Sequence, residues 1–144
     1  MASTTMQTQI NNIFGLDVGN KRVGIAMANT LARLSSPHIT LVRDEEFWSK
    51  LDNLISEEMV SVLVVGLPRN LDGEDTAQTL ATREFVAELK EHFSGEIVMQ
   101  DEALTSIKAE QELSSRKTQF SKADIDSLAA TYILDDYLNE MARG

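Results

Sequence analysis

Four acidic side chains, at three distant points of the 144-residue chain, could act together in one site: Asp17, the adjacent Asp101 and Glu102, and Asp126. Carboxylates gathered in one place repel one another unless cations lie between them. Two Mg²⁺ ions about 3.5–4 Å apart would satisfy such a group and would activate a water molecule for in-line attack on a phosphodiester. The same acids also fit solvated strand and helix ends on an acidic protein, and the spacing alone leaves both interpretations open.

A predicted β-hairpin positions the first of these acids. Residues Ile13–Asn29 contain two apolar runs separated by the polar connection Gly19–Arg22, which has the length of a hairpin turn. Asp17 lies at the end of the first run, where an acid is costly to bury unless something pairs with it. Gly15 and Gly19 leave space beside it for a ligand or a second backbone. Asp17 is therefore either a ligand for a divalent cation or a cap of the turn.

The remaining elements follow from apolar periodicity and from capping residues. They are an edge strand over His38–Val42 after Pro37, a helix over Glu45–Glu58 capped by Asp44, a buried strand over Val60–Gly66, a helix over Glu74–Phe93 that Gly95 ends, a strand over Glu96–Gln100 that leads into the two acids, a helix over Thr105–Leu113, a mobile loop over Ser114–Phe120 and a last helix from about Lys122 to Met141. The first three strands are close enough in sequence to pair antiparallel, whereas the last two are joined through helices, which predicts parallel crossovers. The sequence thus predicts an α/β fold with a mixed five-stranded sheet flanked by helices.

The last predicted helix could deliver a carboxylate to the edge of this sheet. Ala129 and Ala130 follow Asp126 at i+3 and i+4, and small residues on that face would let the helix backbone approach the sheet closely. Asp124, two residues before Asp126, points elsewhere and suits a helix cap. We therefore assign Asp126 to the site and Asp124 to the cap.

Composition limits the class of protein. The chain has no cysteine, which excludes disulfides and thiolate metal sites and fits a reducing cytoplasm. No apolar run is long enough to cross a membrane, and Met1–Gln9 lacks the pattern of a secretory signal. We expect residues 1–10 to be a flexible tail and residues 11–144 to form a single domain. The net charge of −10 argues against a large, non-specific phosphate-binding surface, although a small basic patch is compatible with it.

Four motifs, in order and over most of the chain, resemble one known family. Asp17–Ala26 (D-V-G-N-K-R-V-G-I-A) is similar to the D-x-G-x-K-x-x-G-x-A opening of the YqgF family, also called RuvX. Val64–Gly73 resembles its V-G-L-P-x-N-x-D-G loop, and Asp101–Ser106 resembles its D-E-R-L-[ST]-[ST] segment. Ile125–Leu138 is similar to its V-D-x-x-A-A-x-x-I-L-x-x-Y-L helix. Together these motifs are highly specific, whereas D-x-G alone is not.

The resemblance implies a ribonuclease H-like fold and a metal-dependent nuclease that uses Mg²⁺ or Mn²⁺, with two ions when substrate is bound. It implies catalytic roles for Asp17, Glu102 and Asp126, with Asp101 as a further metal ligand. The family was first described as Holliday-junction resolvases and is now mostly assigned to maturation of the 5′ end of the small-subunit ribosomal RNA precursor. Ala103 departs from the family pattern, which usually has arginine there, and this puts one phosphate contact in doubt.

The same resemblance implies a nucleic-acid surface, and therefore a precursor RNA, a small-subunit precursor particle or branched DNA as the partner of a monomer or weak homodimer. The polar and basic candidates for this surface are Lys21, Arg22, Arg69, Asn70, Lys108, Arg116, Lys117 and Lys122. A locally basic rim would reconcile the acidic net charge with such a substrate.

Two other interpretations stay open at this point. The chain could be a non-catalytic ribosome-assembly factor, which the acidic net charge and Ala103 favour, whereas the retention of all three acids favours catalysis. A D-x-G hairpin also binds ATP phosphates in the related fold of actin and the sugar kinases, but that arrangement needs two such domains, and this chain has the length of one.

Overall fold

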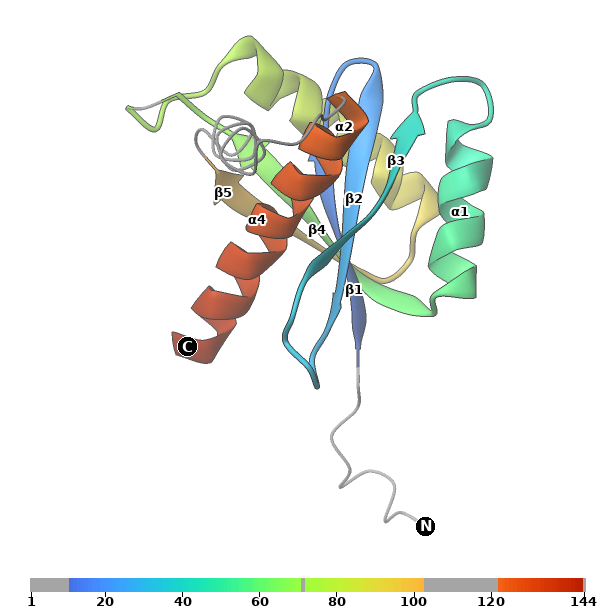
Figure 1. Ribbon diagram of the computed structural model, residues 1–144. Helices are drawn as coiled ribbons and strands as arrows, with labels where there is room; N and C mark the ends of the chain where they lie inside the picture. Colours follow the sequence, from blue (N-terminus) through green and yellow to red (C-terminus); the bar gives the residue numbers. More distant parts are fainter. Residues whose placement is uncertain (1–10, 71, 103–121, 144) are drawn as a thin grey trace.

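A computed structural model describes residues 11–70, 72–102 and 122–143 of the chain, and Figure 1 shows their arrangement. The order of elements is β1 (Asn12–Val18), β2 (Arg22–Asn29), β3 (Ser36–Val42), α1 (Phe47–Glu57), β4 (Val60–Pro68), α2 (Ala77–His92), β5 (Glu96–Glu102) and α4 (Lys122–Arg143). No helix in these described ranges combines the length and hydropathy that a membrane span requires.

The five strands form one mixed sheet in the order β3-β2-β1-β4-β5. The hairpin pairs β1 with β2 in antiparallel register, and β3 continues this pairing along the edge of the sheet. On the other side of β1, strands β4 and β5 run parallel to it. The predicted strand directions and the predicted edge position of β3 are therefore confirmed.

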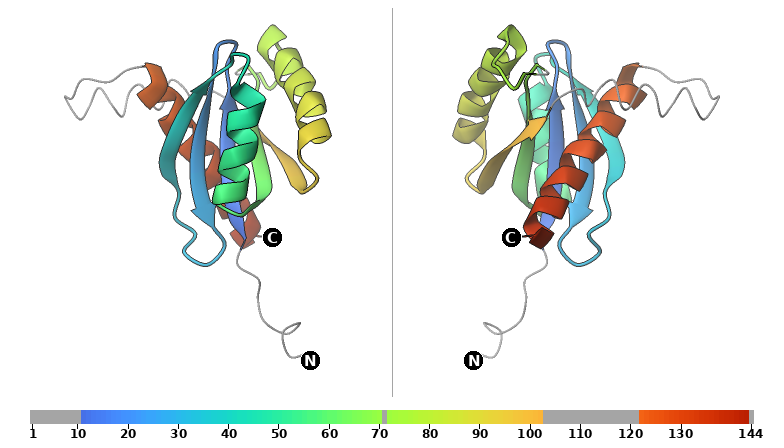
Figure 2. Two further views of the ribbon diagram at one scale, coloured as in Figure 1. Left: turned by 90° about the vertical axis from the view of Figure 1, so that its right-hand side faces the viewer. Right: turned by 90° about the vertical axis from the view of Figure 1, so that its left-hand side faces the viewer.

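Helices cover both faces of this sheet (Figure 2). Helices α1 and α2 pack on one face, where the larger core forms around residues such as Phe14, Leu16, Leu63 and Phe85. Helix α4 crosses the other face and buries a smaller core that includes Ile13, Val64, Ile133 and Leu134. Because successive strand residues point to opposite faces, Asp17 lies on the α4 face, together with Ile13 and Gly15.

Helix α2 begins and ends at residues other than the predicted ones. It begins at Ala77 rather than Glu74, because the Thr76 side chain accepts a hydrogen bond from the backbone of Thr79 in a capping box. It ends at His92, and the following residue, Phe93, is extended. The predicted glycine cap at Gly95 is therefore wrong.

The other predicted boundaries differ by a few residues. Helix α1 begins at Phe47 with Glu46 as its N-cap and without a side-chain cap, so the predicted cap at Asp44 is wrong. Asp44 instead accepts a hydrogen bond from the backbone of Glu46 in the turn before the helix (2.9 Å). Strand β4 continues to Pro68, and β5 continues through both acids to Glu102. The predicted helix over Thr105–Leu113, the predicted loop over Ser114–Phe120 and the predicted tail lie outside the described residues.

Candidate functional site

Asp17 and Asp126 are brought together where α4 crosses the hairpin. Asp17 pairs with Gly24 across strands β1 and β2. A Cβ atom on Gly24 would overlap the backbone carbonyl of Asp126 and would lie only 2.8 Å from the Asp126 Cβ atom. The start of α4 therefore rests directly on β2, next to Asp17. This places the two predicted site acids, more than a hundred positions apart in sequence, beside each other.

The same close approach continues along α4. A Cβ atom on Gly15 would lie 2.9 Å from the Ala130 carbonyl oxygen, and Ala129 and Ala130 are fully buried. The prediction that small residues let the helix backbone approach the sheet is confirmed. The sequence analysis did not identify Gly24 as a contact of α4, although Gly24 is part of the motif Asp17–Ala26. Like Gly15, it is a glycine within an apolar strand, and such a glycine can indicate the close approach of another backbone.

Burial and a like charge act together on Asp17. The pKa of Asp17 is raised from its ordinary value of 3.8 to about 7. Burial of the carboxyl group is the larger cause, and the negative charge of Asp126 is the second. The hairpin turn is closed by a backbone hydrogen bond from Gly19 to Arg22 (2.8 Å), while Asp17 lies on the face covered by α4. These observations favour the site interpretation of Asp17 over the turn cap.

Asp126 has a cationic partner in the hairpin. The Nε atom of Arg22 donates to Oδ2 of Asp126 at 2.8 Å, and both side chains are shielded, with 31% and 21% of their surface exposed. Asp124, by contrast, is exposed in the first turn of α4. The structure therefore separates the two acids as the sequence predicted, with Asp126 towards the sheet and Asp124 towards solvent.

The neighbouring acids of β5 point to opposite faces of the sheet. Asp101 is 70% exposed, and its Oδ1 lies 3.1 Å from Nε of Arg69. Glu102 lies on the α4 face, and its Oε1 atom is buried. A Cβ atom on Gly66 would lie 3.7 Å from Cγ of Glu102, so the Glu102 side chain lies over the central strand β4, between β5 and β1. Of the pair, Glu102 shares the face of Asp17.

These acids do not form a complete metal cluster. In the described ranges, no three aspartate, glutamate, histidine or cysteine side chains are placed to hold one metal ion. The described arrangement thus consists of a close pair, Asp17 and Asp126, and of Glu102 on the same face but two strands away. The common carboxylate site of all three acids stays a prediction.

Two of the predicted nucleic-acid contacts have partners within their own loop. Arg69 donates to the Gly73 carbonyl (3.2 Å) and lies 3.5 Å from Asp75. The side-chain oxygen of Asn70 accepts backbone hydrogen bonds from Asp72 (3.0 Å) and Glu74 (2.8 Å). These contacts give both residues a structural role in shaping the loop after β4.

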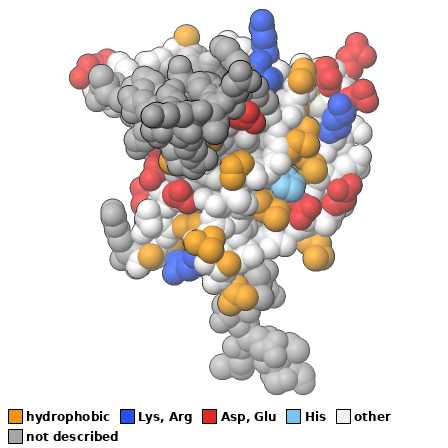
Figure 3. Space-filling view, in the orientation of Figure 1, with side chains coloured by type: hydrophobic (Ala, Val, Ile, Leu, Met, Phe, Trp, Pro, Cys, Tyr) orange, Lys and Arg blue, Asp and Glu red, His pale blue; other side chains and the backbone are white. Residues whose placement is uncertain are grey.

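Of the other predicted contacts, the structure describes the side chains of Lys21 and Arg22 alone. Lys21 is exposed at the hairpin turn, next to Arg22. Lys108, Arg116 and Lys117 lie outside the described residues, and of Lys122 only the position at the start of α4 is described. On the face shown in Figure 3, the described lysine and arginine side chains are few and separated. The basic rim stays a prediction.

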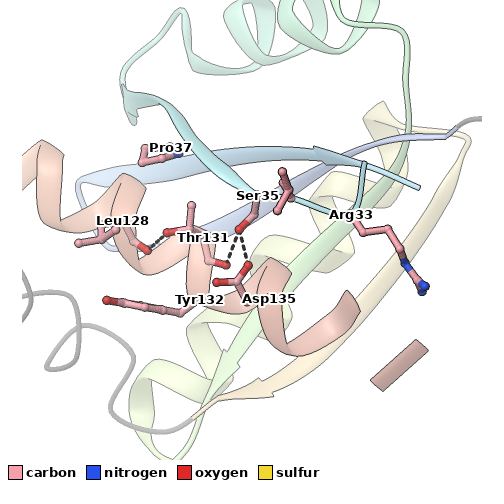
Figure 4. Close-up of a pocket in the computed structure, with 8 residues that line it drawn as sticks. Arg33, Ser35, Pro37, Leu128, Thr131, Tyr132 and Asp135 are labelled. Atoms are coloured by element: carbon pink, nitrogen blue, oxygen red, sulfur yellow. Dashed lines mark hydrogen bonds between the residues drawn. The ribbon is translucent and has the colours of Figure 1, made fainter. Parts of the chain in front are cut away.

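A separate cavity of about 370 Å³ lies between α4 and the segment that leads into β3 (Figure 4). Among the residues that line this cavity, the Ser35 hydroxyl donates to the Asp135 carboxylate and lies 3.4 Å from the Thr131 carbonyl oxygen. Leu128, Tyr132 and Pro37 supply apolar walls. None of the predicted site residues lines this cavity, so we do not place the chemistry there.

Comparison with known proteins gives these acids a context. The model of the family described as "RuvX: Holliday junction resolvase" matches residues 11–140. The chain belongs to the RuvX family. Its RuvX relatives include a protein named "Putative pre-16S rRNA nuclease" from Sulfurihydrogenibium sp. (strain YO3AOP1), which is 38% identical over 92% of this chain and 93% of the relative. A protein of the same name from Chloroflexus aggregans (strain MD-66 / DSM 9485) is 38% identical over 88% of this chain and 92% of its own length.

Solved structures support the fold of this RuvX chain. The fowlpox virus resolvase, solved with Holliday junction DNA, matches with a TM-score of 0.53 at 9% identity, over 90% of this chain and 98% of the resolvase chain. At this identity the likeness concerns the fold alone. Together with the strand order β3-β2-β1-β4-β5, it confirms the ribonuclease H-like fold that the sequence motifs implied.

Proposed function

We propose that this RuvX protein is a metal-dependent endonuclease that hydrolyses phosphodiester bonds during 5′-end maturation of the small-subunit ribosomal RNA precursor, in the cytoplasm. One observation carries the proposal: two acids from opposite ends of the chain, Asp17 and Asp126, lie side by side at the end of β1, with Glu102 on the same face. The RuvX relatives described above are named "Putative pre-16S rRNA nuclease", which supports this substrate class.

The donor atoms of this site fit a divalent metal ion. Mg²⁺ and Mn²⁺ prefer carboxylate oxygens, and the three acids on the α4 face supply only such atoms. Burial of Asp17, and then the negative charge of Asp126, raise the free energy of the ionised Asp17 carboxylate, as its raised pKa indicates, and a cation between the two acids would lower it. Asp17, Asp126 and Glu102 would hold the metal, which would supply an activated water and would stabilise the charge of the transition state.

The chain's own groups fix where these carboxylates lie. Strand β1 places Asp17 at its end, and Gly24 on the neighbouring strand lets α4 come close enough to place Asp126 beside it. Glu102 reaches over Gly66 from β5. Carboxylates on packed strands and on a packed helix are held more firmly than carboxylates on loops, which suits a site whose ligands must keep their geometry.

A second function fits the same site. The family is described as Holliday junction resolvase, so branched DNA is the alternative substrate of a nuclease built on these acids. A non-catalytic assembly factor is the alternative to both. It is supported by the net charge of −10 and by Ala103, which stands where the family usually has arginine.

One cleavage assay separates these alternatives. Purified protein is incubated with a precursor of the small-subunit ribosomal RNA, or with a four-way DNA junction, each in Mg²⁺, in Mn²⁺ and in EDTA. We expect metal-dependent cleavage of the precursor RNA near its 5′ end and little or no cleavage of the junction. Cleavage of the junction alone would support the resolvase. Absence of cleavage of either substrate, with precursor binding retained, would contradict the nuclease and support the assembly factor.

A further inference from the structure

Arg22 contacts one of the proposed metal ligands directly. Its Nε atom donates to Oδ2 of Asp126 at 2.8 Å, across 104 positions of sequence. With 31% and 21% of their surfaces exposed, the two side chains are more shielded than those of the pair between Arg83 of α2 and Asp75 before it, where 41% and 43% are exposed and the atoms are 3.8 Å apart. The Arg22–Asp126 pair is therefore short and partly excluded from water, and such charge-assisted hydrogen bonds fix geometry well.

The backbone of Arg22 is held on a rigid element. Its carbonyl accepts a hydrogen bond from Gly19 (2.8 Å), which closes the hairpin turn. The Arg43 backbone donates to Lys21 (2.8 Å), and the Arg43 guanidinium donates to the Gly19 carbonyl (2.9 Å). The turn is thus tied to the residue that follows β3. Because the backbone of Arg22 is fixed in this way, its side chain can hold the Asp126 carboxylate in one orientation.

Strand β2 consequently holds Asp126 at two points. Gly24 receives the backbone of Asp126, and Arg22, two residues earlier on the same strand, binds its carboxylate. Arg22 binds Asp126 through Oδ2. Because a carboxylate has two oxygens and about four acceptor positions, Oδ1 can still bind a cation while Oδ2 is held.

We propose that Arg22 is a positioning residue of this site: it holds Asp126 through Oδ2 and so orients Oδ1 towards a divalent cation shared with Asp17. The inference rests on the proposed metal-dependent function and assigns to Arg22 a role beyond contact with substrate phosphate. Hydrogen-bonding partners behind a metal ligand act in this way, and their loss commonly weakens metal binding about 10- to 100-fold.

The sign of the effect on metal binding distinguishes this role from simple electrostatics. A guanidinium near a metal ion repels it, so the removal of an arginine without a positioning role would strengthen metal binding. The removal of a positioning arginine weakens it, although a positive charge is lost. Lysine keeps the charge but not the planar geometry of the guanidinium, so it would restore metal binding only in part.

The test measures Mn²⁺ binding to the full-length protein, without substrate, by electron paramagnetic resonance of free Mn²⁺. The variants are Arg22→Met and Arg22→Lys, and the matched control is Arg83→Met, which removes an arginine–aspartate pair outside the site. We expect about a 10-fold weaker affinity for Arg22→Met, a smaller loss for Arg22→Lys and parental affinity for Arg83→Met. Circular dichroism shows whether each variant is folded. If Arg22→Met does not fold, the comparison of Arg22→Lys with the parent is the test.

The outcomes separate this inference from the proposed function. Unchanged or tighter Mn²⁺ binding by folded Arg22 variants would overturn the positioning role, while metal-dependent cleavage by the parent would leave the proposed function standing. Parental protein that binds no Mn²⁺, or Mn²⁺ binding that survives Asp126→Asn, would likewise overturn the positioning role. Absence of metal-dependent cleavage by the parent would overturn the proposed function.

Discussion

Gly24 of β2 lies directly against the backbone of Asp126 in α4, with no room for a side chain between them. Since Gly24 is also the strand partner of Asp17, this contact sets the separation of the two acids. The site therefore depends on a glycine that supplies no chemistry of its own.

Replacement of Gly24 by alanine should separate the two acids. The added methyl group would overlap the Asp126 carbonyl, so α4 must shift at this point, and we expect a loss of about 1–3 kcal/mol in the free energy of unfolding. Gly15→Ala is the matched control, because its methyl group would also press on α4, but at Ala130 and Leu134. Urea denaturation and cleavage rates measured on both variants should give similar stabilities and a much larger loss of cleavage for Gly24→Ala. Equal cleavage losses at equal stability would contradict the role of Gly24 in placing Asp126.

Asp17 should make the stability of the protein depend on pH when no divalent cation is present. Its pKa is about 7 in the folded protein and 3.8 ordinarily, so between these values the folded state binds more protons than the unfolded state. Stability from this residue therefore falls as pH rises from about 4 to about 7 and stays low above that range. Asp17→Asn removes this dependence. In EDTA, the variant should exceed the parent in stability at about pH 8 and lose most of this advantage at about pH 5.

The measurement is urea denaturation of the parent and of Asp17→Asn at both pH values. At each pH, the difference in free energy of unfolding between the two proteins cancels the titration of the other acids. An advantage of Asp17→Asn that is the same at both pH values would contradict the raised pKa.

The two acids of β5 should differ in function. Glu102 lies on the α4 face, so Glu102→Gln should abolish metal-dependent cleavage with little effect on folding. Asp101 points to the other face and meets Arg69 near the surface, so Asp101→Asn should retain most of the cleavage activity and should lower stability by at most about 1 kcal/mol. Single-turnover cleavage assays on the two variants test this. A greater loss of activity for Asp101→Asn than for Glu102→Gln would reverse the assignment.

Much of the fold could be predicted because local patterns determine it. A four-residue polar connection between two apolar runs predicts the hairpin, and helical crossovers predict that β4 and β5 run parallel to β1. The start of α2 was misplaced because Glu74 and Asp75 favour a first turn electrostatically, whereas the hydrogen bonds between Thr76 and Thr79 begin the helix at Ala77, three positions after Glu74.

The candidate acids could be proposed from the sequence, but the contacts that support them could not. Asp101 and Glu102 could not be told apart while the strand was expected to end before them; once β5 continues through both, alternation sends them to opposite faces. The contacts of Asp126 with Gly24 and Arg22 join residues about a hundred positions apart, and no local pattern specifies them.

The most direct test of the account is metal-dependent cleavage of the precursor ribosomal RNA by Asp126→Asn, with Asp124→Asn as the matched control. Both variants remove one carboxylate charge from the first turns of α4, but Asp126 faces the sheet and Asp124 faces solvent. At one fixed salt concentration and in Mg²⁺, we predict that Asp126→Asn loses cleavage at least about a hundredfold, because a ligand is lost, and that Asp124→Asn stays within about threefold of the parent. Parental cleavage by folded Asp126→Asn would contradict the account.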